Sequence, residues 1–172
     1  MGFCLMAKVM ILMGSKSDWE MMTEAAKVLK ELSVSFEVHV ASAHRSPQRV
    51  RRLVCEGEKA GVDIFIAGAG MAAHLAGFIA AHTVKPVIGV PLPGGVASGL
   101  DALLSTAQMP GGIPVACMAV GKAGARNAAV LAAQILALQD PQLGQRLAEV
   151  RAAEARKVTE ADQSLESQVA AL

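Results

Sequence analysis

The run Ser42-Ala43-His44-Arg45-Ser46-Pro47 carries the residue types with the clearest chemical capability in this sequence. An imidazole gives and takes a proton near neutral pH, so His44 is a candidate acid/base residue. The adjacent Arg45 can hold a phosphate or carboxylate through two parallel N–H donors. A lone histidine is often structural, but this one follows a predicted strand and is flanked by Ser and Arg. We therefore predict that His44 is the acid/base residue of an enzyme that acts on a phosphorylated metabolite.

A second polar run, Gly14-Ser15-Lys16-Ser17-Asp18-Trp19, follows the first apolar segment. Gly14 permits a tight turn, Ser15 and Ser17 offer hydroxyl donors, and a helix N-terminus presents unpaired N–H groups to an anion. The run lacks the Walker pattern, and a carboxylate beside a phosphate repels it unless Asp18 faces another group, such as ribose hydroxyls. The run predicts a phosphate site, although an ordinary capped turn explains the same Ser and Asp.

A third run, Gly68-Ala69-Gly70-Met71-Ala72-Ala73-His74, nearly matches the dinucleotide fingerprint GxGxxG/A. That fingerprint needs an acidic residue about 20 positions later to bind a ribose, and the chain has Ile88-Gly89-Val90-Pro91 there. We therefore interpret the run as a small-residue loop that lets a ligand approach the backbone. His74 then lies at the rim of the ligand site or caps the helix that follows.

A fourth stretch, residues 93–101, is too rich in glycine to be regular. Long loops of this kind are commonly lids or binding loops, and a flexible surface connection is the alternative. The two remaining histidines, His39 and His82, have no sequence neighbour that suggests chemistry. We predict structural roles for both.

Five apolar segments of strand length alternate with segments of helical character. They cover residues 9–13, 36–41, 62–67, 86–90 and 113–120. Most are apolar almost throughout, which is typical of parallel strands buried on both faces. The pattern predicts an α/β, doubly wound, three-layer sandwich with a five-stranded parallel sheet. In such sheets ligands bind beyond the carboxyl ends of the strands, which is where the polar runs occur.

The helices between these strands have recognisable ends. Asp18 can cap a helix that reaches about Leu32, and Ser46-Pro47 supplies an N-cap followed by proline at the first helical position. After Gly124, the alanine-rich segment to Leu138 is predicted to form one long helix. Asp140-Pro141 then opens a charged, amphipathic helical tail.

Length and composition favour one domain of 172 residues, with a core at 8–139 and a helical tail at 140–172. The tail either covers the sheet or crosses onto another subunit. The formal net charge is +1 and the basic residues are scattered, which argues against nucleic acid as a partner. The apolar run 9–13 is too short for a membrane span or a signal peptide, and Met6 departs from a lipidation signal. We therefore expect a cytoplasmic protein that does not bind membranes.

The three cysteines, Cys4, Cys55 and Cys117, are odd in number and far apart. None has a CxxC partner or a histidine at metal-ligand spacing. We therefore predict free thiols in a reducing compartment and no metal site.

Four ordered motifs together resemble the N(5)-carboxyaminoimidazole ribonucleotide mutase family of purine synthesis. They are MGSKSDW at 13–19, SAHRSP at 42–47, AGAGMAAHL at 67–75 and LSTAQMP at 104–110. Their order and spacing match as well, and the resemblance extends over nearly all of residues 9–138, including GKAGA at 121–125. It implies a flavodoxin-like fold, a homo-octamer, and an isomerase that needs no cofactor or metal.

The activity implied by the resemblance is the conversion of N(5)-carboxyaminoimidazole ribonucleotide to 4-carboxy-5-aminoimidazole ribonucleotide in de novo purine (IMP) synthesis. His44 is implied to carry the proton. Ala69 and Gly70 are implied to lie against the ring and carboxylate, with His74 also at the substrate. The residues implied to hold the ribose 5-phosphate portion are Ser15, Ser17, Asp18, Ser42 and Arg45.

Three positions depart from the family pattern. Met71 replaces a usual glycine near the expected carboxylate pocket, Ala76-Gly77-Phe78 replaces Pro-Gly-Met, and Ser46 replaces Thr. A related branch carboxylates aminoimidazole ribonucleotide directly with carbon dioxide and tends to have Lys in place of Arg45, so Arg45 and His74 favour the mutase. The open alternatives are that carboxylase, a paralogue that carboxylates a pyridine nucleotide, and a non-catalytic nucleotide-binding module. A purely structural subunit would not cluster polar residues at strand ends.

Overall fold

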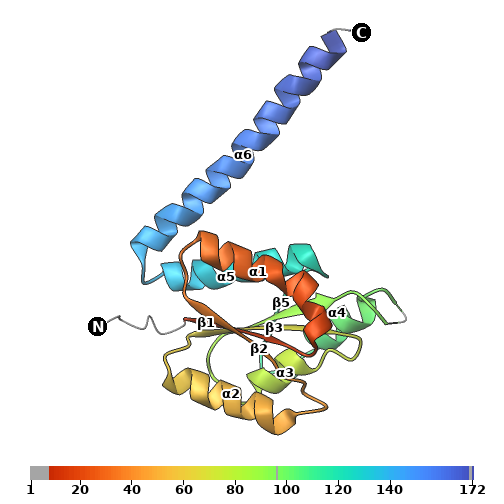
Figure 1. Cartoon of the computed structure of the whole chain (residues 1–172), viewed down its shortest axis with the longest axis vertical. Helices are drawn as coiled ribbons and strands as arrows, with labels where there is room; N and C mark the ends of the chain where they lie inside the picture. Colours follow the sequence, from red (N-terminus) through yellow and green to blue (C-terminus); the bar gives the residue numbers. More distant parts are fainter. Residues whose placement is uncertain (1–7, 96, 171) are drawn as a thin grey trace. The chain divides into compact units, whose positions relative to one another are not determined.

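The computed structural model describes residues 8–95, 97–170 and 172 (Figure 1), so Cys4, Met6 and Val96 lie outside the described residues. Its contacts divide the chain into two compact units, one reaching Ala132 and the other comprising Ala133–Leu172. The boundary falls inside helix α5 (Lys122–Ala137). The organisation as a single domain with a tail at 140–172 stays a prediction.

The first unit contains a five-stranded sheet in the order β2-β1-β3-β4-β5, with every pairing parallel. The strands are β1 (Val9–Met13), β2 (Phe36–Val40), β3 (Ile64–Gly70), β4 (Val87–Leu92) and β5 (Ala116–Cys117). Strands β1 and β4 are buried at every position, as the uninterrupted apolar segments predict. The predicted α/β fold with a five-stranded parallel sheet is confirmed.

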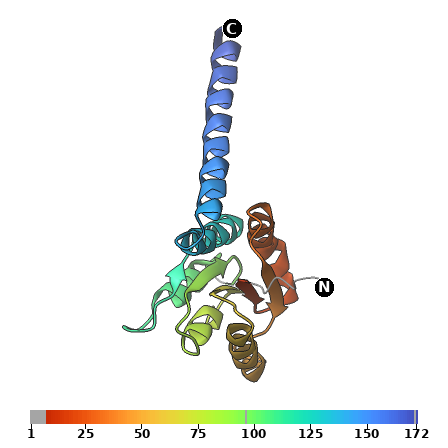
Figure 2. The same cartoon turned by 90° about the vertical axis from the view of Figure 1, so that its left-hand side faces the viewer.

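Helices cover both faces of this sheet (Figures 1 and 2). One face carries α1 (Trp19–Glu31) and the part of α5 up to Ala132, and the other carries α2 (Pro47–Lys59), α3 (Leu75–Ala80) and α4 (Leu100–Ala107). The buried face of α5 is made of alanines, which let the helix axis approach the strands closely. The result is the predicted three-layer arrangement.

The prediction of a strand over residues 113–120 is too long. Only Ala116 and Cys117 pair with β4. The chain before them turns at Pro110, whose carbonyl accepts the Ile113 amide, and Pro114 has no N–H to donate to a ladder. Beyond this short pairing, the Met118 amide still donates to the Gly89 carbonyl at 2.8 Å.

Asp18 stands at the N-cap of α1 and Leu32 at its C-cap, as predicted, but the expected side-chain capping bond is absent. The 3-10 turn η1 (Lys16–Asp18) precedes α1 and is capped by Ser15, and Asp18 makes no side-chain capping bond to α1. Helix α2 begins at Pro47 with Ser46 at its N-cap, as predicted, but Ser46 also makes no capping bond. Its hydroxyl instead accepts the Ser42 amide at 3.0 Å and so closes the preceding turn.

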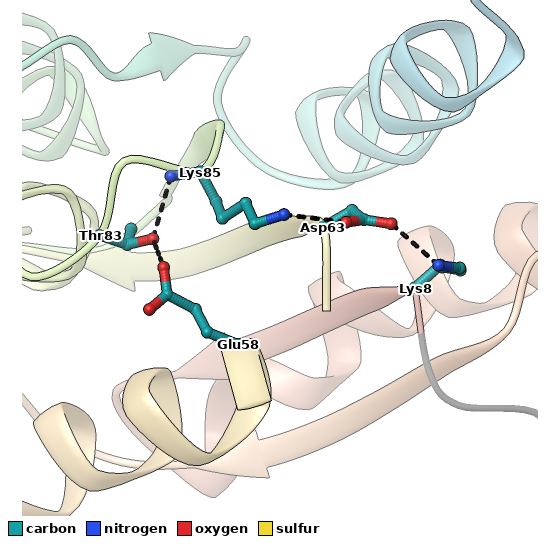
Figure 3. A network of polar contacts seen from close by, with 5 residues as sticks. All are labelled: Lys8, Glu58, Asp63, Thr83 and Lys85. Carbon is teal, nitrogen blue, oxygen red and sulfur yellow. Dashed lines mark hydrogen bonds and ion pairs between the residues drawn. The ribbon is translucent and has the colours of Figure 1, made fainter. Parts of the chain in front are cut away.

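An ion-pair network ties together the chain around the amino-terminal ends of β1, β3 and β4 (Figure 3). The carboxylate of Asp63 lies 3.1 Å from the Lys8 ammonium and 3.0 Å from that of Lys85. Thr83 donates a short hydrogen bond to Glu58 of α2 and accepts the Lys85 amide. The hydrogen bond from Lys85 holds the pKa of the Asp63 carboxyl below its ordinary value, and Lys8 lowers it further. The network lies at the end of the sheet opposite the polar runs.

The second unit holds the end of α5 and the helix α6 (Pro141–Ala170). Asp140 accepts the amides of Gln142 and Leu143, so Asp140-Pro141 opens this helix as predicted. Within the described residues, no helix is both long and apolar enough to span a bilayer.

Candidate active site

A cavity of about 560 Å³ lies at the carboxyl end of the sheet. Its walls come from the loops that follow β1, β2, β3 and β4, because parallel strands deliver all their carboxyl ends to one edge. Strand β1 lies between β2 and β3 in the sheet. The chain therefore passes from β1 to β2 on one side of β1, and then crosses to β3 on the other side. The predicted site residues all line this cavity, namely Ser15, Ser17, Asp18, Ser42, His44, Arg45, Ala69, Gly70 and His74.

The two cavity histidines contact each other. The distance between His44 Nε2 and His74 Nδ1 is 2.8 Å, and the rings meet edge to face at 85°. A neutral imidazole has one N–H and one lone pair, so one ring donates to the other and the two tautomers are coupled. Between these two nitrogens the pair holds one proton. Such a pair can present His44 either as a base or, once protonated from outside, as an acid.

His74 occupies the N-cap position of α3 but makes no side-chain capping bond. The alternative that it caps this helix is therefore wrong, and its ring is directed to His44 instead. The other two histidines do not line the cavity. His39 pairs with Glu37 on β2 at 3.1 Å, and His82 bonds the Phe78 carbonyl at 2.7 Å, in keeping with the structural roles predicted for them.

Arg45 bridges the loops after β1 and β2. One terminal nitrogen of its guanidinium donates to the Gly14 carbonyl at 2.9 Å, and its amide donates to Ser42 Oγ at 3.2 Å. These bonds orient the guanidinium toward the first loop, on the cavity wall that also carries the Ser15 and Ser17 hydroxyls. A guanidinium has five N–H donors, so this one can anchor the loops and still bind an anion.

Asp18 is half-buried beside this cationic group. Its carboxylate accepts the Ser15 amide at 2.9 Å, and the Ser17 hydroxyl donates to Ser15 Oγ at 2.9 Å. Burial raises the pKa of the Asp18 carboxyl, while the Ser15 amide and the Arg45 charge act in the opposite direction. The carboxylate is thus engaged with the loop backbone, which reduces its repulsion of an anion at the hydroxyls.

The loop after β3 forms a wall of small residues. Gly70 packs against the Leu92 carbonyl, where a Cβ would lie only 3.4 Å from the oxygen. Met71 adopts a positive φ of 55° and is 64% exposed in the cavity wall. Pro93, Gly94 and Gly95, from the fourth predicted loop, line the same cavity. The prediction that this loop is a lid is not tested by the described geometry.

Sequence reasoning missed one residue that supports the site. Ser105 of α4 accepts the Ala73 amide at 3.0 Å and so holds the loop that carries His74. Its motif is conspicuous in the sequence, but nothing in the spacing shows which loop it contacts.

Among the described residues, no group of three or more His, Cys, Asp or Glu side chains is arranged to hold a metal ion. Cys55 and Cys117 are free thiols, and burial raises the pKa of Cys117.

A family model described as AIR carboxylase matches residues 8–157. The chain belongs to the AIR carboxylase family. The family resemblance expected from the four motifs is therefore confirmed.

Relatives within this AIR carboxylase family carry the name N5-carboxyaminoimidazole ribonucleotide mutase. One from Escherichia coli K12 is 52% identical over 154 residues, which cover 90% of this chain and 91% of the relative. One from Bacillus subtilis is 48% identical over 155 residues, covering 90% and 96%. The crystal structure of Treponema denticola PurE superposes with a TM-score of 0.82 at 31% identity and covers 91% of this chain and 97% of the other.

Replacement of Asp18 by Asn tests the electrostatics of the part of the cavity lined by Ser15, Ser17 and Arg45. Because burial raises the Asp18 pKa above its unfolded value, its contribution to stability is present at low pH and is lost as the pH rises through the raised pKa. Asn has no charge to bury and can still accept the Ser15 amide. We expect the variant to unfold up to about 2 °C above the wild type at pH 7, and the gap to close below about pH 4.

The matched control is Asp162→Asn, which makes the same chemical change on the exposed surface of α6. It should leave the midpoint of thermal unfolding unchanged at both pH values. A lower midpoint for Asp18→Asn at pH 7 would show that attraction to Arg45 outweighs the cost of burial.

Proposed function

We propose that this protein is an N5-carboxyaminoimidazole ribonucleotide mutase, in which His44 carries the proton between the two ends of the carboxyl migration. The observation that carries the proposal is the contact between His44 and His74 in a cavity that Arg45 and the Ser15 and Ser17 hydroxyls also line. Relatives with this name are about half identical to the chain over most of its length. The product is 4-carboxy-5-aminoimidazole ribonucleotide, an intermediate of de novo purine synthesis.

In the proposed reaction, His44 gives up one proton and later takes one back. Protonated His44 donates to the exocyclic nitrogen as the nitrogen–carbon bond breaks, which releases carbon dioxide and the aminoimidazole. The ring carbon then attacks the carbon dioxide and forms the new carbon–carbon bond. Neutral His44 removes the proton from that ring carbon and returns to its starting state, so no net proton, cofactor or metal is consumed.

The proposed binding mode divides the cavity into two ends. The hydroxyls of Ser15 and Ser17 and the guanidinium of Arg45 suit the doubly charged phosphate, with Ser42 bracing Arg45 and Asp18 bracing the loop. At the other end, the small residues Ala69 and Gly70 allow the imidazole ring and its carboxylate to approach the backbone beside His44 and His74. This orientation places the reacting atoms next to the proton carrier.

Direct carboxylation of aminoimidazole ribonucleotide is the nearest competing reaction, and the family model itself is described as a carboxylase. The two reactions share the second half of the mechanism and differ only in the carboxyl donor. Arg45 and His74, together with the names of relatives that are about half identical to this chain, favour the mutase. A nucleotide-binding module without catalysis would need the phosphate end but not the histidine pair.

A substrate comparison separates these reactions. In buffer depleted of bicarbonate, the protein should convert N5-carboxyaminoimidazole ribonucleotide to the 4-carboxy product, followed by the change in ultraviolet absorbance or by chromatography. Aminoimidazole ribonucleotide with added bicarbonate should react far more slowly at the same nucleotide concentration. Turnover that requires aminoimidazole ribonucleotide and carbon dioxide would instead establish the carboxylase.

Replacement of His44 by Asn tests the proton carrier. Asn retains similar bulk and hydrogen-bonding capacity but has no group that titrates near neutral pH, so kcat should fall by about 100-fold or more. Nucleotide affinity, measured by calorimetry with the product, should stay within about threefold, because the phosphate contacts are unchanged. The control is His39→Asn, the same change on β2 outside the cavity, which should keep wild-type kcat. Persistent activity in His44→Asn would eliminate the proposed role.

We further propose a cytoplasmic homo-octamer. Leu100 and Leu104 lie one turn apart on α4 and are each about half exposed, which forms an apolar surface of the kind that subunit contacts cover. The number eight rests on the family resemblance. The free thiols of Cys55 and Cys117 suit a reducing compartment.

Native mass spectrometry tests the assembly. The wild type should give a species of eight chains. The variant Leu104→Glu should shift the population to smaller species, because it places a charge in the proposed contact. The control Val158→Glu, at an exposed position of α6, should leave the octamer intact. A wild type that is monomeric at micromolar concentration would contradict the proposal.

A further inference from the structure

The motif LSTAQMP has no assigned part in the proposed reaction, yet its serine reaches the active-site loop. Ser105 does not line the cavity, and its Oγ accepts the Ala73 amide at 3.0 Å. The same hydroxyl lies 3.2 Å from the Ala102 carbonyl and 3.5 Å from the Met71 carbonyl, so its hydrogen is directed between the helix and the loop. Ser105 therefore connects α4 to both sides of the turn that precedes His74.

This turn requires support from outside. Met71 has a φ of 55°, in the left-handed region that side chains other than glycine rarely adopt. Ala73 is only 1% exposed, so an Ala73 amide without Ser105 would be buried without an acceptor. Because a strained turn persists only where the surroundings hold it, the Ser105 contact keeps this backbone in its observed form.

The helix that supplies Ser105 is itself firmly placed. Gly89 of β4 lies directly beneath Thr106, and a Cβ at Gly89 would clash with that side chain and approach Val115 to 2.9 Å. The buried hydroxyl of Thr106 bonds the Ala102 carbonyl at 2.7 Å within the helix. Helix α4 is therefore seated closely on the sheet and can act as a fixed support for the loop.

We propose that Ser105 is a positioning residue, whose hydroxyl holds the turn from Met71 to Ala73 so that the ring of His74 meets His44. The chain of contacts runs from the Ser105 hydroxyl to the Ala73 amide, then to the adjacent His74, whose Nδ1 lies 2.8 Å from His44 Nε2. Ser105 thereby fixes the tautomers of the histidine pair without touching substrate. The effect of Ser105 on the reaction rate rests on the proposed mutase function, whereas its effect on the tautomers of the two histidines does not.

The first measurement uses the full-length protein and steady-state kinetics. The variant Ser105→Ala should lower kcat by roughly 10- to 100-fold, because a small displacement of His74 misaligns the proton carrier. KM should change less than about threefold, since the phosphate end is untouched. Ser105→Thr keeps the hydroxyl and should recover activity to within about threefold of the wild type.

The matched control is Thr106→Val. It removes the neighbouring hydroxyl, which bonds the same Ala102 carbonyl, while it keeps the side-chain shape and leaves the loop contact in place. It should retain wild-type kcat. If Thr106→Val is as impaired as Ser105→Ala, or Ser105→Thr is not rescued, the effect belongs to the stability or packing of α4 and the proposal is overturned.

The second measurement does not depend on catalysis. In protein labelled with 15N-histidine and free of ligand, two-bond nitrogen–proton spectra report the tautomer of each ring. The wild type and Thr106→Val should show one dominant tautomer for His44 and for His74, and Ser105→Ala should show mixed tautomers for both. An unchanged spectrum in Ser105→Ala would overturn the inference, even if the wild type proved to be a mutase. A wild type without mutase activity would overturn the proposed function and leave this spectroscopic test valid.

Discussion

The candidate active site depends on one constraint, the parallel pairing of β1 with β2 on one side and β3 on the other. Parallel pairing brings the carboxyl ends of these strands to one edge, so loops far apart in the sequence meet there. The Arg45 bond to the Gly14 carbonyl and the contact between His44 and His74 each join two such loops. Without the sheet order, neither the Arg45 contact with Gly14 nor the histidine pair would form.

Much of this arrangement is predictable from the sequence because it follows from local patterns. The uninterrupted apolar run of β1 predicts a strand buried on both faces, and the structure has it at Val9–Met13. The polar residues after the first three strands are likewise predictable as neighbours, because the end of a parallel strand is a fixed place in the fold. That reasoning places His44 and Arg45 in the cavity, although their roles in a reaction stay proposals.

The remainder depends on contacts that spacing does not encode. The sequence allows the Asp18 side chain to cap α1, but its carboxylate accepts the amide of Ser15 instead. His74 stands at an N-cap position, yet its ring bonds a residue 30 positions away. Strand β5 is shorter than its apolar run because Pro114 interrupts the ladder. For Asp18 and His74, a polar group had several possible partners, and the tertiary structure selected one.

The proposed site combines rigid and strained parts. A residue that both gives and takes a proton must keep one orientation through both steps, and an exposed imidazole on a loop has freedom to rotate. The contact between His44 and His74 removes part of that freedom. It orients His44 only if the loop that carries His74 is itself held in place. That loop includes Met71 at a positive φ, so its conformation is not the one the backbone would choose alone. A hydroxyl from α4 resolves the problem by linking the strained turn to a helix that packs directly on the sheet. Two hydrogen bonds, between Ser105 and the Ala73 amide and between His74 and His44, thus connect α4 to the atom proposed to carry the proton.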